Sequence, residues 1–166
     1  MILDNKIDKA RIIVSVGIVA LFLCIGIVLS ILLYVVNSKE KYIDANSFKQ
    51  VEATYSYDVS AIRKESTAYY IDGYCCRLGE DTTLTSTRVA LFDREANELI
   101  VCPTEARIDT SINATVNDGY EHQNAGYHAM IQYGKLEHKK YEICLIVDED
   151  GEDCVIHSAL ELENDI

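Results

Sequence analysis

Cys144 and His157 are the residues of this sequence whose types could form a catalytic pair. A cysteine becomes a nucleophile when a neighbouring imidazole accepts its proton. A hairpin around residues 148–153 would set Cys144 across from His157 and leave Glu142 on the solvent face. No third residue that orients the imidazole is evident, so a chance pairing of neighbours is the simpler interpretation. We therefore expect no catalytic residue and no enzyme activity.

The cysteines and histidines lack the spacing of a metal site. Zinc sites usually carry C-x2-C or H-x3-H pairs, whereas Cys75 and Cys76 are adjacent and the histidines are scattered at positions 122, 128, 138 and 157. Asp148-x-Asp150-Gly151 resembles the middle of an EF-hand loop, but His157 then takes the twelfth position, which requires a carboxylate. We expect an acidic turn there, and no metal or cofactor.

Five cysteines lie outside the apolar segment that contains Cys24: residues 75, 76, 102, 144 and 154. An odd number leaves at least one thiol free or paired between chains. Cys144 and Cys154 would project from opposite faces of their hairpin, so a disulfide between them would be strained. Cys75 and Cys76 also point to opposite faces, so only one of them can meet Cys102. The alternative to disulfide formation is that the cysteines remain reduced and act as small buried apolar side chains.

An uncharged apolar run extends from Ile12 to Val36. Its 25 residues exceed the roughly 20 that a helix needs to cross a bilayer core. A buried core helix would need a larger surrounding domain, and a signal peptide would be shorter and followed by a cleavage site. The sequence predicts a single-pass signal-anchor helix at 12–36 in the cell membrane, after a short tail at 1–11.

Lysines and arginines flank this segment almost equally, so charge barely decides its orientation. A tail this short before a first apolar segment usually stays inside, which favours an extracytoplasmic domain. Gly26 and Ser30 lie four residues apart on one face and could contact a second helix, because small residues let backbones approach closely in lipid. Gly17 falls on the opposite face.

The remainder of the chain is strongly acidic. The whole sequence has a net charge of −12, and the residues after the apolar segment hold 12 basic and 25 acidic side chains, a net of −13. Nucleic acid and anionic lipid surfaces would be repelled by that charge. We therefore expect no nucleic-acid partner.

Alternation of apolar and polar residues predicts a small all-β domain at 51–166, after a polar juxtamembrane linker at 37–50. About seven strands without a long amphipathic helix favour a sandwich. The expected strands are Glu52–Val59, Thr67–Arg77, Thr87–Asp93, Glu98–Cys102, Gly126–Tyr133, Tyr141–Val147 and Cys154–Leu162. A short helical turn is expected within residues 107–117.

Two hairpins have a predicted register. The first sets Leu91 opposite Leu99 and Val89 opposite Val101. The second sets Leu145 opposite Ile156 and Val147 opposite Cys154. The core face of the second hairpin would then consist of Tyr141, Ile143, Leu145, Val147, Ile156, Leu160 and Leu162.

The order of short motifs over residues 68–160 resembles a family of small β-sandwich modules in bacterial cell-surface proteins. The motifs are Ile71-Asp72-Gly73-Tyr74, a hairpin at 89–101, Arg107-Ile108-Asp109, and Ala125-Gly126-Tyr127. The chain departs from the family in its cysteines and in Tyr74, where the family usually has Trp. The resemblance implies an accessory module that accompanies envelope-polysaccharide proteins, rather than an enzyme.

Two function classes follow. The first is a membrane-anchored binding or assembly module for an envelope glycan or a neighbouring envelope protein. Its possible ligand contacts are Tyr69, Tyr70, Tyr74, Tyr120, Tyr127 and Tyr133. The alternative is a structural or scaffold membrane subunit, in which the β domain is a spacer or oligomerisation unit. An exposed aromatic strip on a sheet would favour the first class.

Overall fold

The computed structural model describes residues 16–32, 41–51 and 54–165, and the chain divides into two compact units, residues 1–39 and 40–166. In the first unit, helix α1 spans residues 16–32, which confirms a helix within the predicted apolar segment. Residues 12–15 and 33–36 of that segment, and the tail at 1–11, lie outside the described residues. Within the ranges that are described, no helix is long and apolar enough to cross a membrane.

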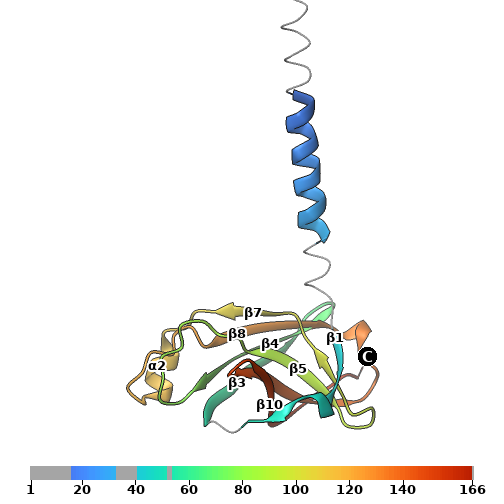
Figure 1. The fold of residues 1–166 in the computed structure, drawn as a ribbon. Helices are drawn as coiled ribbons and strands as arrows, with labels where there is room; N and C mark the ends of the chain where they lie inside the picture. The colour runs from blue at the N-terminus through green and yellow to red at the C-terminus, as the bar shows by residue number, and fades with distance from the viewer. Residues whose placement is uncertain (1–15, 33–40, 52–53, 166) are drawn as a thin grey trace, which may run out of the picture. The chain divides into compact units, whose positions relative to one another are not determined.

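The second unit consists mainly of two β-sheets, as predicted (Figure 1). The six-stranded sheet has the order β1 (Lys41–Asp44), β6 (Glu98–Val101), β5 (Arg88–Asp93), β9 (Lys140–Glu149), β10 (Glu152–Glu163) and β2 (Lys49–Gln50). The four-stranded sheet has the order β3 (Tyr55–Lys64), β4 (Ala68–Arg77), β8 (Gly126–Gln132) and β7 (Thr104–Arg107). Paired strands are antiparallel except β2, which is parallel to β10.

The described residues of this unit also form three short helices: η1 (Ala45–Ser47), α2 (Ser111–Val116) and η2 (Tyr133–Lys135). Helix α2 confirms the predicted helical turn and lies at one end of the β domain (Figure 1). Ile112 and Val116 of α2 pack with Tyr74 and Cys76 of β4. This helix therefore covers part of the four-stranded sheet.

The main core contains side chains from both sheets. Tyr69 and Ile71 of β4 and Tyr127 of β8 meet Leu91 of β5 and Leu145 of β9 in this cluster. A smaller cluster lies on the opposite face of the six-stranded sheet, where the buried Cys144 and Ile146 belong to a group that packs with Ala45 and Phe48 from the segment between β1 and β2. Each sheet thus has an inner face on the main core and an outer face away from it.

The β9–β10 hairpin has the predicted register, since Leu145 pairs with Ile156 and Val147 with Cys154. The prediction that Leu160 lies on the core face is wrong, because this residue is 44% exposed. The register shifts between His157 and Glu161, and Ala159 has a positive φ of 60°. A bulge therefore turns Leu160 outward before Leu162 returns to the core.

The predicted register of the β5–β6 hairpin is wrong by one residue. Leu91 pairs with Ile100, and Ala90 pairs with Val101. The Asp93 carboxylate accepts hydrogen bonds from the N–H groups of Glu95 and Ala96, and Asn97 has a left-handed φ of 55°. This turn leaves four residues between the paired Asp93 and Glu98. Leu99 therefore lies in the smaller cluster, because a one-residue slip exchanges the faces of a strand.

The predicted linker at 37–50 is wrong from residue 41 onward, because β1 and β2 lie there as strands of the six-stranded sheet. The described β structure thus begins ten residues before the predicted boundary at 51. Strand β7 was also missed. These three strands have four residues or fewer and show no alternating pattern long enough to predict them.

Gly73 of β4 lies at a position where a side chain would not fit. Gly73 pairs with Tyr127 of the neighbouring strand β8. A Cβ atom at Gly73 would collide with the Tyr127 ring and with the carbonyl oxygen of Asp58. The Tyr127 hydroxyl donates a hydrogen bond to that carbonyl at 3.1 Å. The glycine therefore makes room for a fully buried ring and its polar end.

Candidate functional site

The outer face of the four-stranded sheet carries a polar group that we call the Asp72 cluster: Asp72, Arg63, Arg107 and His128. Arg63 Nη2 donates to Asp72 Oδ2 at 2.7 Å, and Arg107 Nη1 donates to Oδ1 at 3.3 Å. His128 Nδ1 lies 2.7 Å from the same Oδ1 atom. The residues come from β3, β7 and β8 around a carboxylate in the middle of β4. Three strands thus hold their basic side chains on one acid.

Asp72 is buried although it lies on an outer face. Burial alone would raise the pKa of its carboxyl group, but the His128 hydrogen bond and the charges of Arg63 and Arg107 hold that pKa below its usual range. Asp72 therefore stays ionised and orients its partners. The side chains of Arg63 and Arg107 are 53% and 61% exposed, so the guanidinium groups also face solvent.

Tyr70 and Tyr74 are the predicted contacts that share this outer face. The Tyr70 ring stacks on the His128 imidazole, with centroids 5.5 Å apart and planes inclined by 17°. Tyr74 lies four residues further along β4, where α2 partly covers it. Both are half-buried. Tyr70 therefore presents an aromatic surface directly beside the Asp72 cluster.

The other predicted contacts lie elsewhere. Tyr69 and Tyr127 are enclosed in the main core, which corrects their proposed role as ligand contacts. Tyr133 packs against the main core and its hydroxyl donates to the Ser66 carbonyl. Tyr120 is exposed in the loop before β8. The alternation of β4 and β8 already separates Tyr69 and Tyr127 from Tyr70, because neighbouring residues point to opposite faces.

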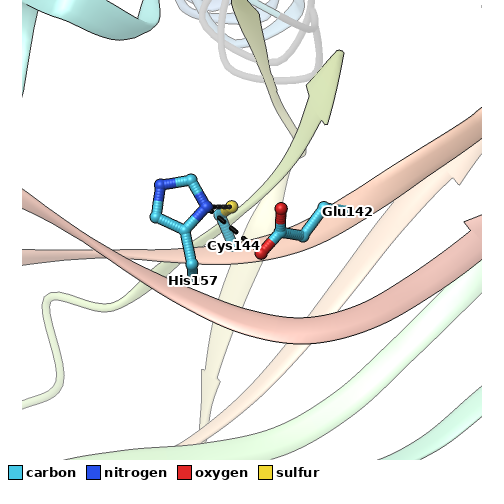
Figure 2. A group of neighbouring side chains, drawn as sticks. All are labelled: Glu142, Cys144 and His157. Carbon is cyan, nitrogen blue, oxygen red and sulfur yellow. Dashed lines mark hydrogen bonds and ion pairs between the residues drawn. The ribbon is translucent and has the colours of Figure 1, made fainter. Parts of the chain in front are cut away.

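The outer face of the six-stranded sheet carries a second group, the Glu142 cluster: Glu142, Cys144 and His157. Figure 2 shows all three side chains converging on one point. His157 Nδ1 lies 3.4 Å from Cys144 Sγ and 3.2 Å from Glu142 Oε1. The register confirms that His157 is directly opposite Cys144. Glu142 precedes Cys144 by two residues in β9, so both project from the same face.

Two further side chains, Arg94 and Phe92, contact the Glu142 cluster. Arg94 Nη2 donates to Glu142 Oε2 at 3.0 Å, which leaves Oε1 facing His157. Phe92 packs its ring edge to face with the His157 imidazole, with centroids 5.4 Å apart. Cys144 is fully buried and Glu142 nearly so, whereas the His157 side chain is 47% exposed. The cluster is therefore open to solvent on the histidine side.

This geometry does not match a nucleophilic triad. In such triads the imidazole uses one nitrogen for the nucleophile and the other for the carboxylate. Here the same atom, Nδ1, faces both Cys144 and Glu142. Burial, followed by the charge of Glu142, raises the pKa of the Cys144 thiol to about 12, against a lowering by Arg94. The thiol is thus protonated at neutral pH, whereas a catalytic cysteine needs a stabilised thiolate.

Cys75, Cys76, Cys144 and Cys154 are buried thiols outside any disulfide, one of the alternatives that the sequence left open. Cys75 and Cys154 belong to the main core, whereas Cys76 and Cys144 lie on outer faces. The opposite orientations predicted for Cys75 and Cys76, and for Cys144 and Cys154, are confirmed. Burial raises the pKa of Cys75 to about 12 and that of Cys76 to about 11. These thiols act as small apolar side chains.

In α1, Ser30 Oγ donates to the Gly26 carbonyl at 2.9 Å. The two predicted contact residues therefore do share one helix face. A Cβ atom at Gly26 would meet no atom within 4 Å, and the same holds for Gly17. Isoleucine at either position is thus compatible with the helix, and both remain suitable probes of a helix contact.

The residues of both clusters are only partly visible in the sequence. His157 and Cys144 were paired correctly, but Glu142 was assigned to solvent, although its spacing from Cys144 already places it on the same strand face. Asp72 is a charged residue inside an otherwise apolar and aromatic strand, which marks it as unusual. Arg63 could not be found, because β3 contains a bulge between Asp58 and Ala61 that shifts its register.

Comparisons of the chain with protein-family models, with curated proteins and with solved structures gave no match. A fold alone does not determine a function, because one fold hosts many. The function must therefore be argued from the geometry of these two clusters and from the apolar segment.

Proposed function

We propose that this chain is a membrane-anchored, non-catalytic binding module of the bacterial cell surface that recognises an envelope glycan. The binding surface is the outer face of the four-stranded sheet, at Tyr70 and the Asp72 cluster. The single observation that carries the proposal is the Tyr70–His128 stack beside two guanidinium groups held by one buried carboxylate.

This arrangement suits a sugar. One face of a sugar ring is largely C–H and packs on an aromatic ring, while its hydroxyl groups need hydrogen-bond partners. Tyr70 supplies the ring. Arg63 and Arg107 each carry five N–H donors, of which the structure describes one hydrogen bond to Asp72 in each case. Because Asp72 fixes these side chains before binding, a ligand loses less free energy in ordering them.

The membrane anchor is supported by the uncharged run from Ile12 to Val36 and by α1, whose apolar side chains are exposed. We propose that the β domain lies outside the cytoplasm. The full chain should stay with membranes after a carbonate wash, and external protease should cleave the β domain on intact cells. Release by carbonate would contradict the anchor, and a protected domain would contradict the orientation.

The resemblance to envelope-polysaccharide modules supports a glycan over an unrelated ligand. Its Gly-aromatic motifs have a structural basis here, since Gly73 accommodates Tyr127 and the following Tyr74 lies on the outer face. The acidity of the domain agrees with a neutral rather than a strongly anionic glycan.

The test is binding of the full chain, in a mild detergent, to a panel of immobilised bacterial envelope glycans. Tyr70→Ala should weaken binding by about tenfold, which corresponds to the roughly 1.4 kcal/mol of one well-placed aromatic contact. The matched control is Tyr42→Ala, because Tyr42 is an exposed tyrosine on β1 of the other sheet. Equal losses in both variants would contradict the proposed surface.

The alternative function is a scaffold subunit in which the β domain only spaces or joins copies of the chain. It predicts no glycan binding by wild-type protein, together with self-association that survives Tyr70→Ala. Light scattering in detergent, run beside the glycan panel, separates the two functions.

A further inference from the structure

The Glu142 cluster brings an oxygen, a sulfur and a nitrogen atom close enough together to coordinate one metal ion. Glu142, Cys144 and His157 each offer one ligand atom, and these three atoms lie within 4.8 Å of one another (Figure 2). We propose that these three atoms bind a zinc-class divalent cation. The site belongs to the six-stranded sheet and does not depend on the glycan surface proposed for the four-stranded sheet.

The distances agree with tetrahedral coordination. Zinc bonds of about 2.0–2.1 Å to nitrogen or oxygen and about 2.3 Å to sulfur keep neighbouring ligand atoms roughly 3.3–3.6 Å apart. His157 Nδ1 is 3.4 Å from Cys144 Sγ and 3.2 Å from Glu142 Oε1. These two distances are within a few tenths of an ångström of the tetrahedral spacing, and the distance between the Cys144 and Glu142 ligand atoms is at most 4.8 Å.

The backbone holds the donors in place before binding. Glu142 and Cys144 are two residues apart on one face of β9, and His157 is the cross-strand partner of Cys144 on β10. The bulge begins directly after His157, where the Ser158 hydroxyl donates to the Ile143 carbonyl at 2.6 Å. Two hydrogen-bonded strands thus supply all three ligands, which favours a rigid site.

Two neighbours act on the ligands without touching the ion. Arg94 binds the Oε2 atom of Glu142 and so directs Oε1 to the site. Phe92 packs against the His157 ring and limits its rotation. Groups that orient metal ligands in this way are a regular part of metal sites, and their loss typically costs about 10–100-fold in affinity.

The donor set favours a particular class of metal. A thiolate and an imidazole select zinc and its cobalt substitute, whereas magnesium and calcium require oxygen ligands. Binding releases the Cys144 thiol proton to solvent and forms the metal–sulfur bond, without any change of oxidation state. The ion enters from the exposed His157 side, and three protein ligands leave a fourth position for water.

The experiment is a titration of the full chain, purified in detergent without a histidine tag, with Co²⁺. Tetrahedral cobalt bound to a thiolate gives visible ligand-field bands and a near-ultraviolet sulfur-to-cobalt band. We expect both bands to saturate at one ion per chain. Cys144→Ser and His157→Ala should each weaken binding by about 100-fold or more, and Glu142→Gln by about 10-fold or more.

The controls keep residue type and location matched. Cys154→Ser alters a buried cysteine of the same hairpin on the opposite face, and His138→Ala alters an exposed histidine outside the cluster. Both should bind Co²⁺ like wild type. His157 is itself half exposed, so His157→Ala should keep the fold, which far-ultraviolet circular dichroism checks. Zinc should raise the melting temperature of wild type but not that of His157→Ala.

Several results would overturn the proposal. The first is a wild-type chain that binds no stoichiometric Co²⁺. The second is a sulfur-to-cobalt band that persists in Cys144→Ser or disappears in Cys154→Ser. A zinc-induced rise in melting temperature that is equal in wild type and in folded His157→Ala would also exclude this site.

Discussion

The two outer faces of the β domain each bury a carboxylate beside an arginine and a histidine, yet the two clusters differ in what they leave available. Asp72 uses both oxygens for nitrogen donors, two of them permanently cationic. Glu142 uses one oxygen for Arg94 and turns the other to a histidine nitrogen that also faces a thiol. In the Asp72 cluster both carboxylate oxygens are occupied by ion pairs and hydrogen bonds. In the Glu142 cluster three potential metal-ligand atoms converge. The neighbours of a buried acid therefore decide its chemistry more than its burial does.

Both faces depend on the core between them, so the largest expected effect lies there. Leu145 is fully buried beside Cys144 and pairs with Ile156. Leu145→Ala should lower the free energy of unfolding by about 2–5 kcal/mol, because the cavity adds to the lost burial. Chemical denaturation followed by fluorescence of the eleven tyrosines measures it, since the chain has no tryptophan.

The control for this variant is Leu160→Ala, which truncates an exposed leucine of the same hairpin. Its cost should stay within about 0.5 kcal/mol, because little surface is buried there. A cost at Leu160 as large as that at Leu145 would mean that the bulge does not turn Leu160 outward.

The next largest effect is expected for a substitution in the Asp72 cluster. Asp72→Asn should cost about 1–2 kcal/mol at neutral pH, because two guanidinium groups and His128 lose a charged acceptor. The pKa of Asp72 lies below its unfolded value of about 3.9, so its contribution is present above that pH and is lost as the pH falls through the folded pKa. The stability difference between wild type and Asp72→Asn should therefore shrink below about pH 4. A difference that is constant down to about pH 2 would exclude this role.

The smallest effect on the free energy of unfolding is expected in the Glu142 cluster when no metal is bound. Glu142→Gln should cost about 0.5–1 kcal/mol, because Arg94 is largely exposed and solvent screens its pair with Glu142. Saturating zinc should increase this cost, because the wild type gains more binding free energy than the variant. Zinc should leave the cost of Asp72→Asn unchanged. An equal response of the two variants would mean that the two clusters do not differ in metal chemistry.

The sequence by itself determined the elements whose patterns are local and long. The apolar run predicted the helix at α1. Each strand of six residues or more was expected at least in part, because alternation over that length is a clear signal, although β3 continues for five residues beyond its predicted end at Val59. The β9–β10 register followed from apolar residues that must share one face, and with it came the Cys144–His157 pair. Opposite orientations of neighbouring cysteines followed from the period of a strand.

Only the tertiary structure decided the features that depend on turns, bulges and long-range pairing. The turn at Asp93 shifted the β5–β6 register by one residue, because hydrogen bonds of a single side chain set the loop length. The sequence predicted that the outer faces are exposed to solvent. Instead, Ala45 and Phe48 pack against one of them, and distant strands bring Arg63 and Arg107 to Asp72. Glu142 joined its cluster because side chains from other parts of the same sheet meet it there: Arg94 from the β5–β6 turn and His157 from β10. Such contacts depend on strand pairing between residues far apart in the chain.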